Sequence, residues 1–300
     1  MRYIPFITWF SLLALANAQD SNESLTAPRQ PSRLPENLRS TFTEPTPEER
    51  SASIENNQKT LTSGKYFVTQ SWSQEKKYRR PYHVNVPKSR TLESPDKLKR
   101  FPVFIFLHGN GGNAMSAMQG FMRRHERMVM HYILVFAQGY RESWNIVSER
   151  SKADDLGFIE SMVQRLATFK NVAPDDFSIM GNSNGAALVN QIAIETSLPH
   201  IRNYITGVSQ LNAWQYDGKH FKAKGDQNQY HAVAAPMKGK RLMNISGTED
   251  KLVPYHGGPS TFIPANDGKL KFVAAEESIY LWAREMGYTG EKKTHPSSKA

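Results

Sequence analysis

The stretch Phe177-Ser178-Ile179-Met180-Gly181-Asn182-Ser183-Asn184-Gly185 decides the predicted fold. Its first four residues are typical of a short strand, and a helix is predicted over 184–196. Between them lies the pattern Gly-x-Ser-x-Gly, which places Ser183 on a sharp strand-to-helix turn. The turn lifts the hydroxyl off the sheet, next to a helix N-terminus that favours developing negative charge. Ser183 is therefore the candidate nucleophile, and the N–H group of Asn184 is a candidate oxyanion donor.

Predicted strands alternate with predicted helices on both sides of this turn. The continuous apolar runs at 103–107 and 132–137 are typical of strands that are buried on both faces. Further strands are predicted at 66–72, 82–86, 204–208 and 242–245, and further helices at 154–169 and 275–286. Asp154 or Asp155 is expected to cap the first of these helices. The alternation indicates an α/β fold with a mostly parallel sheet and helices on both faces.

A glycine-rich loop follows the early strand at 103–107. It has the sequence His108-Gly109-Asn110-Gly111-Gly112, and its backbone N–H groups can point at the same oxyanion. Asn110 is the expected second donor, and His108 is assigned a structural role. A phosphate-binding loop is the weaker alternative, because neither of the usual nucleotide-binding glycine patterns is present.

A carboxylate follows the late strand at 242–245, in the segment Gly247-Thr248-Glu249-Asp250. Residues just beyond such a strand lie at the functional edge of the sheet, and the triad order in this fold is serine, acid, histidine. Asp250 is therefore expected to orient the catalytic histidine, with Glu249 as the neighbouring alternative.

Aromatic residues stand in three loops at the predicted active edge. Trp144, Trp214 and Tyr255 are expected to bind the acyl or aromatic group of a substrate; packing against the loops is the alternative. The histidines lack metal-ligand spacing, so no metal and no cofactor are expected.

Five motifs, taken in order, resemble one group of α/β hydrolases. They are the loop at 107–114, Trp144-Asn145, the helix start at 154–159, Gly181 to Gly185, and the segment from Gly247 to Gly258. The group includes feruloyl esterases, acetylxylan esterases and extracellular poly(hydroxybutyrate) depolymerases. The resemblance covers about residues 100–287. It implies an esterase of the α/β-hydrolase fold in which Ser183 and Asp250 match the nucleophile and the acid.

The chain departs from this group at the catalytic histidine. The group places that residue after one more strand beyond the helix at 275–286, whereas the segment from Gly287 to Ala300 is polar. His256 follows Asp250 by only six positions, so it is poorly placed to reach Ser183, and His295 is assigned as the base. The expected fold therefore lacks its last strand. Either the sequence is truncated, or the protein has lost its catalytic base.

Targeting and domain boundaries are predicted at the N-terminal end. Residues 1–18 have a positive start, an apolar run and the small-x-small site Ala16-Asn17-Ala18, which together are typical of a signal peptide and predict a secreted protein. Residues 19–60 are polar and are expected to form a disordered arm or linker, and 61–300 the hydrolase domain. The absence of cysteine excludes thiol nucleophiles and disulfides.

The positive net charge of the chain suggests an alternative function. The chain carries a formal charge of +10, partly in clusters at 76–80 and 238–241 that are expected to be exposed. No nucleic-acid motif accompanies this charge, and no membrane partner is expected after signal cleavage. The main hypothesis is an ester hydrolase acting on polysaccharide-linked or polyester acyl groups through an acyl-Ser183 intermediate. The alternatives are an inactive hydrolase-fold protein that binds carbohydrate or polyanions, and a serine peptidase of the same fold.

Overall fold

The computed structural model describes residues 59–88 and 100–293. The predicted signal peptide, nearly all of the predicted arm at 19–60, and His295 lie outside these residues. The positions of Ser183, Asp250, His256 and the other candidate residues are all described.

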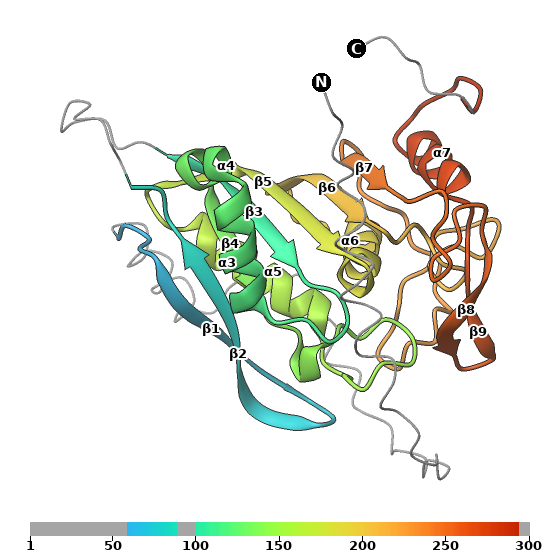
Figure 1. Ribbon diagram of the computed structural model, residues 1–300, viewed down its shortest axis with the longest axis horizontal. Coiled ribbons are helices and arrows are strands. Elements are labelled where there is room, and N and C mark those ends of the chain that lie inside the picture. Colours follow the sequence, from blue (N-terminus) through green and yellow to red (C-terminus); the bar gives the residue numbers. More distant parts are fainter. Residues whose placement is uncertain (1–58, 89–99, 294–300) are drawn as a thin grey trace.

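A seven-stranded sheet forms the centre of the molecule (Figure 1). Its strands are β1 (Gly64–Trp72), β2 (Glu75–Asn85), β3 (Phe101–Leu107), β4 (Ile133–Ala137), β5 (Val172–Asn182), β6 (Ile201–Gly207) and β7 (Arg241–Ile245). Their order across the sheet is β1-β2-β4-β3-β5-β6-β7. The β1–β2 hairpin pairs antiparallel with β4, while the strands from β4 to β7 run parallel to one another. The predicted mostly parallel sheet is confirmed.

Helices cover both faces of the sheet, α3 (Ala114–Arg124) and α4 (Glu126–His131) on one and α5 (Asp155–Ala167) and α6 (Asn184–Glu195) on the other (Figure 1). The alternation of β3 side chains explains this arrangement. Phe104 and Phe106 pack against Phe121 of α3, whereas Ile105 and Leu107 belong to the larger core that includes the buried faces of α5 and α6. Every residue of β3 must therefore be apolar, because each face of the sheet packs against its own hydrophobic core.

Two regions contain elements that were not predicted. α3 and α4 occupy 114–131, and an antiparallel hairpin of β8 (Gly258–Ala265) and β9 (Gly268–Phe272) precedes α7 (Ala275–Glu285). α3 buries only Ala114 fully; Met115 is exposed and the remaining apolar residues are half-buried, so no run of fully buried residues marks this helix. The hairpin leaves Phe262 65% exposed, which hides the strand alternation in the sequence.

β7 is the last strand of the sheet within the described residues. It pairs with β6 on one side, and Met243 and Ile245 are 57% and 41% exposed.

The expectation of exposed basic clusters is wrong for two residues, Arg80 and Lys240. Arg80 is fully buried because it forms an ion pair with Asp155 of α5. Lys240 is buried because its ammonium group donates to the carbonyl oxygens of Ala193 and Thr196, at the C-terminal end of α6. Both lysines of the first cluster, Lys76 and Lys77, are exposed as expected.

The described part of the chain contains no helix with the length and apolar character needed to cross a bilayer. Nor do residues 59–88 and 100–293 gather three or more His, Cys, Asp or Glu side chains in an arrangement suited to a metal ion.

Candidate active site

The loops that carry Ser183, the glycine-rich motif and Asp250 begin at one edge of the sheet because parallel strands end there together. Leu107 of β3 stands level with Ala137 of β4 and Gly181 of β5, so the loops after these strands start side by side. Farther along the sheet, Gly207 of β6 is level with Ile245 of β7, which leads into the segment that carries Asp250.

Ser183 occupies a strained turn between β5 and α6. Its backbone has φ 51° and ψ −119°, a conformation that non-glycine residues rarely adopt and that costs about 1–3 kcal/mol. Its N–H group donates to the Gly207 carbonyl oxygen at 2.8 Å, and its own carbonyl oxygen accepts from Ala186 and Ala187. These bonds hold the turn in place, and the Ser183 side chain remains half-buried rather than enclosed.

The flanking glycines are required by close backbone contacts. A Cβ atom on Gly181 would overlap the carbonyl group of Gly185. One on Gly185 would overlap the carbonyl oxygens of Leu107 and His108, where α6 crosses the end of β3. The strand order and this turn together decide the fold. The protein has the α/β-hydrolase fold.

Replacing Gly185 by alanine is expected to destabilise the hydrolase fold by at least about 2 kcal/mol, because the new methyl group must push α6 away from β3. The free energy of unfolding from urea titration measures the effect. Gly64→Ala is the matched control, since a Cβ there meets only the Tyr66 ring at 3.7 Å. Equal stabilities of the two variants would contradict this account of the turn.

The backbone hydrogen bonds of the two loops show which N–H groups are free to act as oxyanion donors. In the glycine-rich loop, the Gly111 N–H donates to the Glu142 carbonyl oxygen at 2.8 Å, and that of Gly112 donates to Gly109 at 3.0 Å. Both groups are thus engaged, which leaves Gly109 and the predicted Asn110 as the donors in this loop. A Cβ atom on Gly109 would lie 3.5 Å from the Ser183 Cβ, so this loop borders the nucleophile. On the other side, Asn184 is the first residue of α6, where N–H groups have no intrahelical acceptor.

His108 ties the glycine-rich loop to the loop after β4, as expected of a structural residue. Its Nδ1 lies 2.7 Å from the Gly109 carbonyl oxygen, and its Nε2 accepts from the Gly139 N–H at 3.0 Å. Burial lowers the pKa of His108, an effect only partly opposed by the bond to Gly109. The ring is therefore neutral at pH 7, with the proton on Nδ1.

The prediction that Trp144 binds substrate with its ring is wrong. Trp144 is fully buried, and its indole N–H donates to the His108 carbonyl oxygen at 2.7 Å. The ring also packs on the His108 imidazole, with centroids 5.0 Å apart. The loop folds back over the sheet edge here, so the side chain that was expected to face a substrate faces the protein.

Trp214 and Tyr255 are both half-buried, and they differ in surroundings. The Trp214 ring packs against Tyr230 at 5.9 Å, and the Tyr230 hydroxyl donates to the Ile146 carbonyl oxygen beside the Trp144 loop. Tyr255 instead directs its hydroxyl to Glu276 of α7, at 3.0 Å. Trp214 is therefore the better placed of the two to line the site, and its role stays a prediction.

Asp250 has the geometry of an orienting acid more clearly than Glu249 does. Its Oδ1 accepts from the N–H groups of Leu252 and Val253 at 2.8 and 3.0 Å, which fixes the carboxylate and leaves Oδ2 for another partner. Asp250 is half-buried, whereas Glu249 is exposed.

No histidine within 59–88 and 100–293 forms a hydrogen bond or ion pair with Ser183 or Asp250. His256 lies exposed at a turn closed by the bond from the Gly257 N–H to the Pro254 carbonyl oxygen, and its ring contacts Tyr255. The assigned base, His295, lies outside the described residues and stays a prediction.

Sequence reasoning missed the buried polar residues behind the site, above all Glu149. Its carboxylate accepts from the N–H groups of Ile146 and Val147 and from the side-chain amide of Asn184. Burial raises the pKa of Glu149, and the N–H bonds act in the opposite direction. Nothing in the local sequence distinguishes this glutamate from a solvated one.

A pH-dependent stability is expected from Lys240, which binds the last carbonyls of the helix that carries Ser183. Burial lowers the pKa of Lys240 to about 8, although Glu160 acts in the opposite direction. The unfolded chain therefore binds more protons between pH 8 and its lysine pKa of about 10.4, and stability rises with pH there. The rise from Lys240 is about 2 kcal/mol between pH 8 and 10.

Urea unfolding at several pH values checks this expectation, with Lys240→Met as the comparison. The difference in unfolding free energy between wild type and variant should grow by about 2 kcal/mol from pH 8 to 10. A constant difference would contradict the role of burial. Measurements stop at pH 10 because burial raises the pKa of Tyr82 to about 12, so ionisation of tyrosine then favours the unfolded chain.

Comparison with known proteins supports the predicted resemblance. Feruloyl esterase B of Piromyces equi is 23% identical over 199 residues, which are 65% of this chain and 34% of that protein. The chain thus spans about a third of the length of that relative. No protein-family model matches the sequence.

Solved structures of hydrolases align with parts of the chain at low identity. Thermogutta terrifontis esterase 2 phosphoramylated by tabun is 13% identical, with a TM-score of 0.43 and coverage of 76% of this chain and 79% of that one. The S-formylglutathione hydrolase of Staphylococcus aureus is 13% identical, with a TM-score of 0.36 and coverage of 48% and 57%. The fold assignment itself rests on the strand order and the turn at Ser183.

Proposed function

We propose that the chain is an exported serine hydrolase that cleaves carboxylic esters through an acyl-Ser183 intermediate. The observation that carries this proposal is the strained turn, in which a non-glycine residue at φ 51° stands at a helix N-terminus beside a glycine-rich loop. A conformation of this cost persists where it serves a purpose, and here it presents a hydroxyl between two sets of N–H donors.

The proposed reaction assigns each group one task. A base takes the Ser183 proton as the oxygen attacks the ester carbonyl carbon, and the N–H groups of Asn184 and of Gly109 or Asn110 hold the resulting oxyanion. Collapse expels the alcohol with that proton, and water then releases the acid by the same route. Asp250 orients the base through its free Oδ2, and His295 is the proposed base.

The proposed substrates are acyl groups on polysaccharide or polyester. Support comes from the feruloyl esterase relative and from the formal charge of +10, which favours an acidic matrix. Export is proposed from the leader-like features of residues 1–18.

Covalent labelling tests the proposal on the full chain. An alkyl fluorophosphonate is expected to label one peptide, the one that contains Ser183, and short-chain nitrophenyl esters are expected to be hydrolysed. His295→Ala should abolish turnover, while His256→Ala should retain it. Labelling at another residue, or turnover that does not depend on Ser183, would refute the proposal.

A second candidate is a polyanion-binding protein without catalysis. It is favoured by the absence of a described histidine bonded to Ser183 or Asp250, and by a hollow of about 450 Å³ at the opposite edge of the sheet. Three arginines line this hollow with Asp175 and Asp176: Arg100, Arg202 and Arg241. Retention on heparin that falls with salt and with Arg202→Ser, in a chain without esterase activity, would support it over the first proposal.

A further inference from the structure

Trp144 is bonded to both loops that carry the candidate oxyanion donors. Its backbone N–H donates to the Asn184 Oδ1 at 2.7 Å, and its carbonyl oxygen accepts from the Asn184 Nδ2 at 3.1 Å. Its indole N–H donates to the His108 carbonyl oxygen at 2.7 Å. One residue thus connects the start of α6 with the start of the glycine-rich loop.

The indole bond is buried, whereas the two bonds to Asn184 are partly buried. Trp144 and His108 are 0% and 3% exposed, so water does not compete for the indole donor. A buried hydrogen bond of this kind is costly to lose, because the His108 carbonyl would keep no replacement partner.

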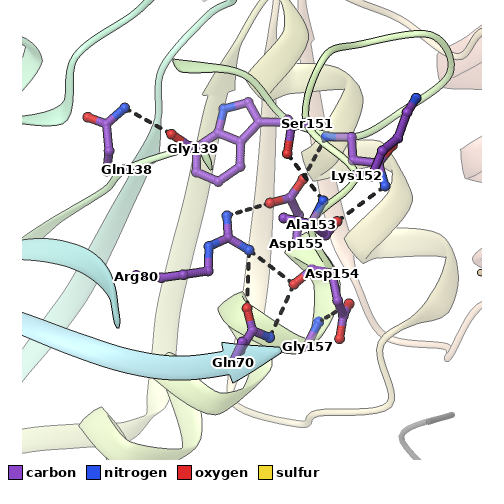
Figure 2. Close-up of polar contacts among 12 residues, drawn as sticks. Gln70, Arg80, Gln138, Gly139, Ser151, Lys152, Ala153, Asp154, Asp155 and Gly157 are labelled. Carbon is purple, nitrogen blue, oxygen red and sulfur yellow. Dashed lines mark hydrogen bonds and ion pairs between the residues drawn. The ribbon is translucent and has the colours of Figure 1, made fainter. Parts of the chain in front are cut away.

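The segment around Trp144 is held to the core by the buried carboxylate of Asp155. The Asn145 N–H donates to the Asp155 Oδ2 at 2.6 Å, and the Asp155 Oδ1 forms an ion pair with Arg80 at 2.5 Å. Figure 2 shows Arg80 reaching from β2 towards Asp155, with Gln70 beside them. Both charged side chains are fully buried, so the anchor lies between β2 and α5 rather than on the surface.

We propose that Trp144 is a positioning residue that fixes the spacing between the two halves of the oxyanion hole. This inference rests on the proposed function. Trp144 does not face the substrate; it holds the backbone of Asn184 and the loop from His108 to Asn110 so that one oxygen accepts from both. Such preorganised donors stabilise the charge that develops in the transition state more than the neutral ground state.

The test is Trp144→Phe, which keeps an aromatic ring beside His108 and removes the indole donor. The kcat for a short-chain nitrophenyl ester is expected to fall about 10- to 100-fold, because small displacements of oxyanion donors have effects of this size. KM should stay within about twofold, since the donors act mainly in the transition state.

Trp282→Phe is the matched control. Trp282 of α7 is also buried, at 2% exposure, but its indole N–H has no hydrogen-bond partner in the described structure. Its replacement should leave kcat and KM unchanged. The proposal is overturned by an equal loss of kcat in both variants, by a kcat of Trp144→Phe within about twofold of wild type, or by a change confined to KM.

A wild-type chain that shows no Ser183-dependent turnover would contradict the proposed function. The positioning role of Trp144 is then tested by a separate measurement. Amide hydrogen exchange of residues 108–113 then decides. Faster exchange of this segment in Trp144→Phe than in Trp282→Phe supports the positioning role, and equal exchange overturns it.

Discussion

Ser183→Ala is expected to lower kcat/KM for nitrophenyl esters at least about 1,000-fold, because the remaining oxyanion donors and substrate binding give only residual catalysis. The same variant should lose all labelling by an alkyl fluorophosphonate. The measurement is initial-rate kinetics over a range of ester concentrations, with labelling followed by mass spectrometry.

A stability measurement shows whether the loss of activity comes from the missing hydroxyl or from unfolding of the variant. Ser183 has φ 51°, a strained angle that alanine does not relieve, so the variant should unfold at nearly the wild-type urea concentration. Ser178→Ala is the matched control, because Ser178 lies within β5, away from the carboxyl edge of the sheet. A Ser183→Ala chain with wild-type turnover would eliminate the acyl-Ser183 intermediate.

Arg80→Met is expected to lower the free energy of unfolding by about 3–5 kcal/mol, since it leaves the Asp155 carboxylate buried without its counter-ion. Arg80 also donates to the Gln70 side chain and to the Asp154 carbonyl oxygen, and its guanidinium lies 4.0 Å from the centre of the Phe158 ring. Equilibrium unfolding in guanidinium chloride, followed by near-ultraviolet circular dichroism, measures the loss.

The neighbouring arginine supplies the control. Arg79 is exposed and stacks on the Phe67 ring at 4.0 Å, so Arg79→Met should cost no more than about 1 kcal/mol. The double variant Arg80→Met/Asp155→Leu should be more stable than the sum of the two single changes predicts, because it leaves no unpaired charge. Equal losses in Arg79→Met and Arg80→Met would contradict the ion pair as the source of the effect.

The strands of the central sheet and the turn at Ser183 were predictable because their signals are local. An apolar run such as 103–107 indicates a strand covered on both faces wherever it occurs. The Gly-x-Ser-x-Gly pattern is equally local, and Gly181 is required by a contact with Gly185 in the same turn. The Asp154 cap was equally local: its Oδ1 accepts from the Gly157 N–H three residues on.

Other features were decided by contacts between distant segments. Arg80 stands in a basic run of sequence, and only the docking of α5 against β2 buries it against Asp155, 75 residues away. Trp144 was expected to face a substrate. Its ring instead packs on His108 and points into the interior of the protein. The β8–β9 hairpin likewise carries too weak an alternation to predict from sequence.

The sequence by itself therefore determined which residues stand at the edge of the sheet: a serine on a sharp turn, a glycine-rich loop and an aspartate after a late strand, each marked by a local sequence pattern. The tertiary structure decided what holds these pieces in register. Trp144, Asp155, Arg80 and Glu149 act through partners far along the chain, and whether a polar residue is buried against such a partner depends on how the elements pack.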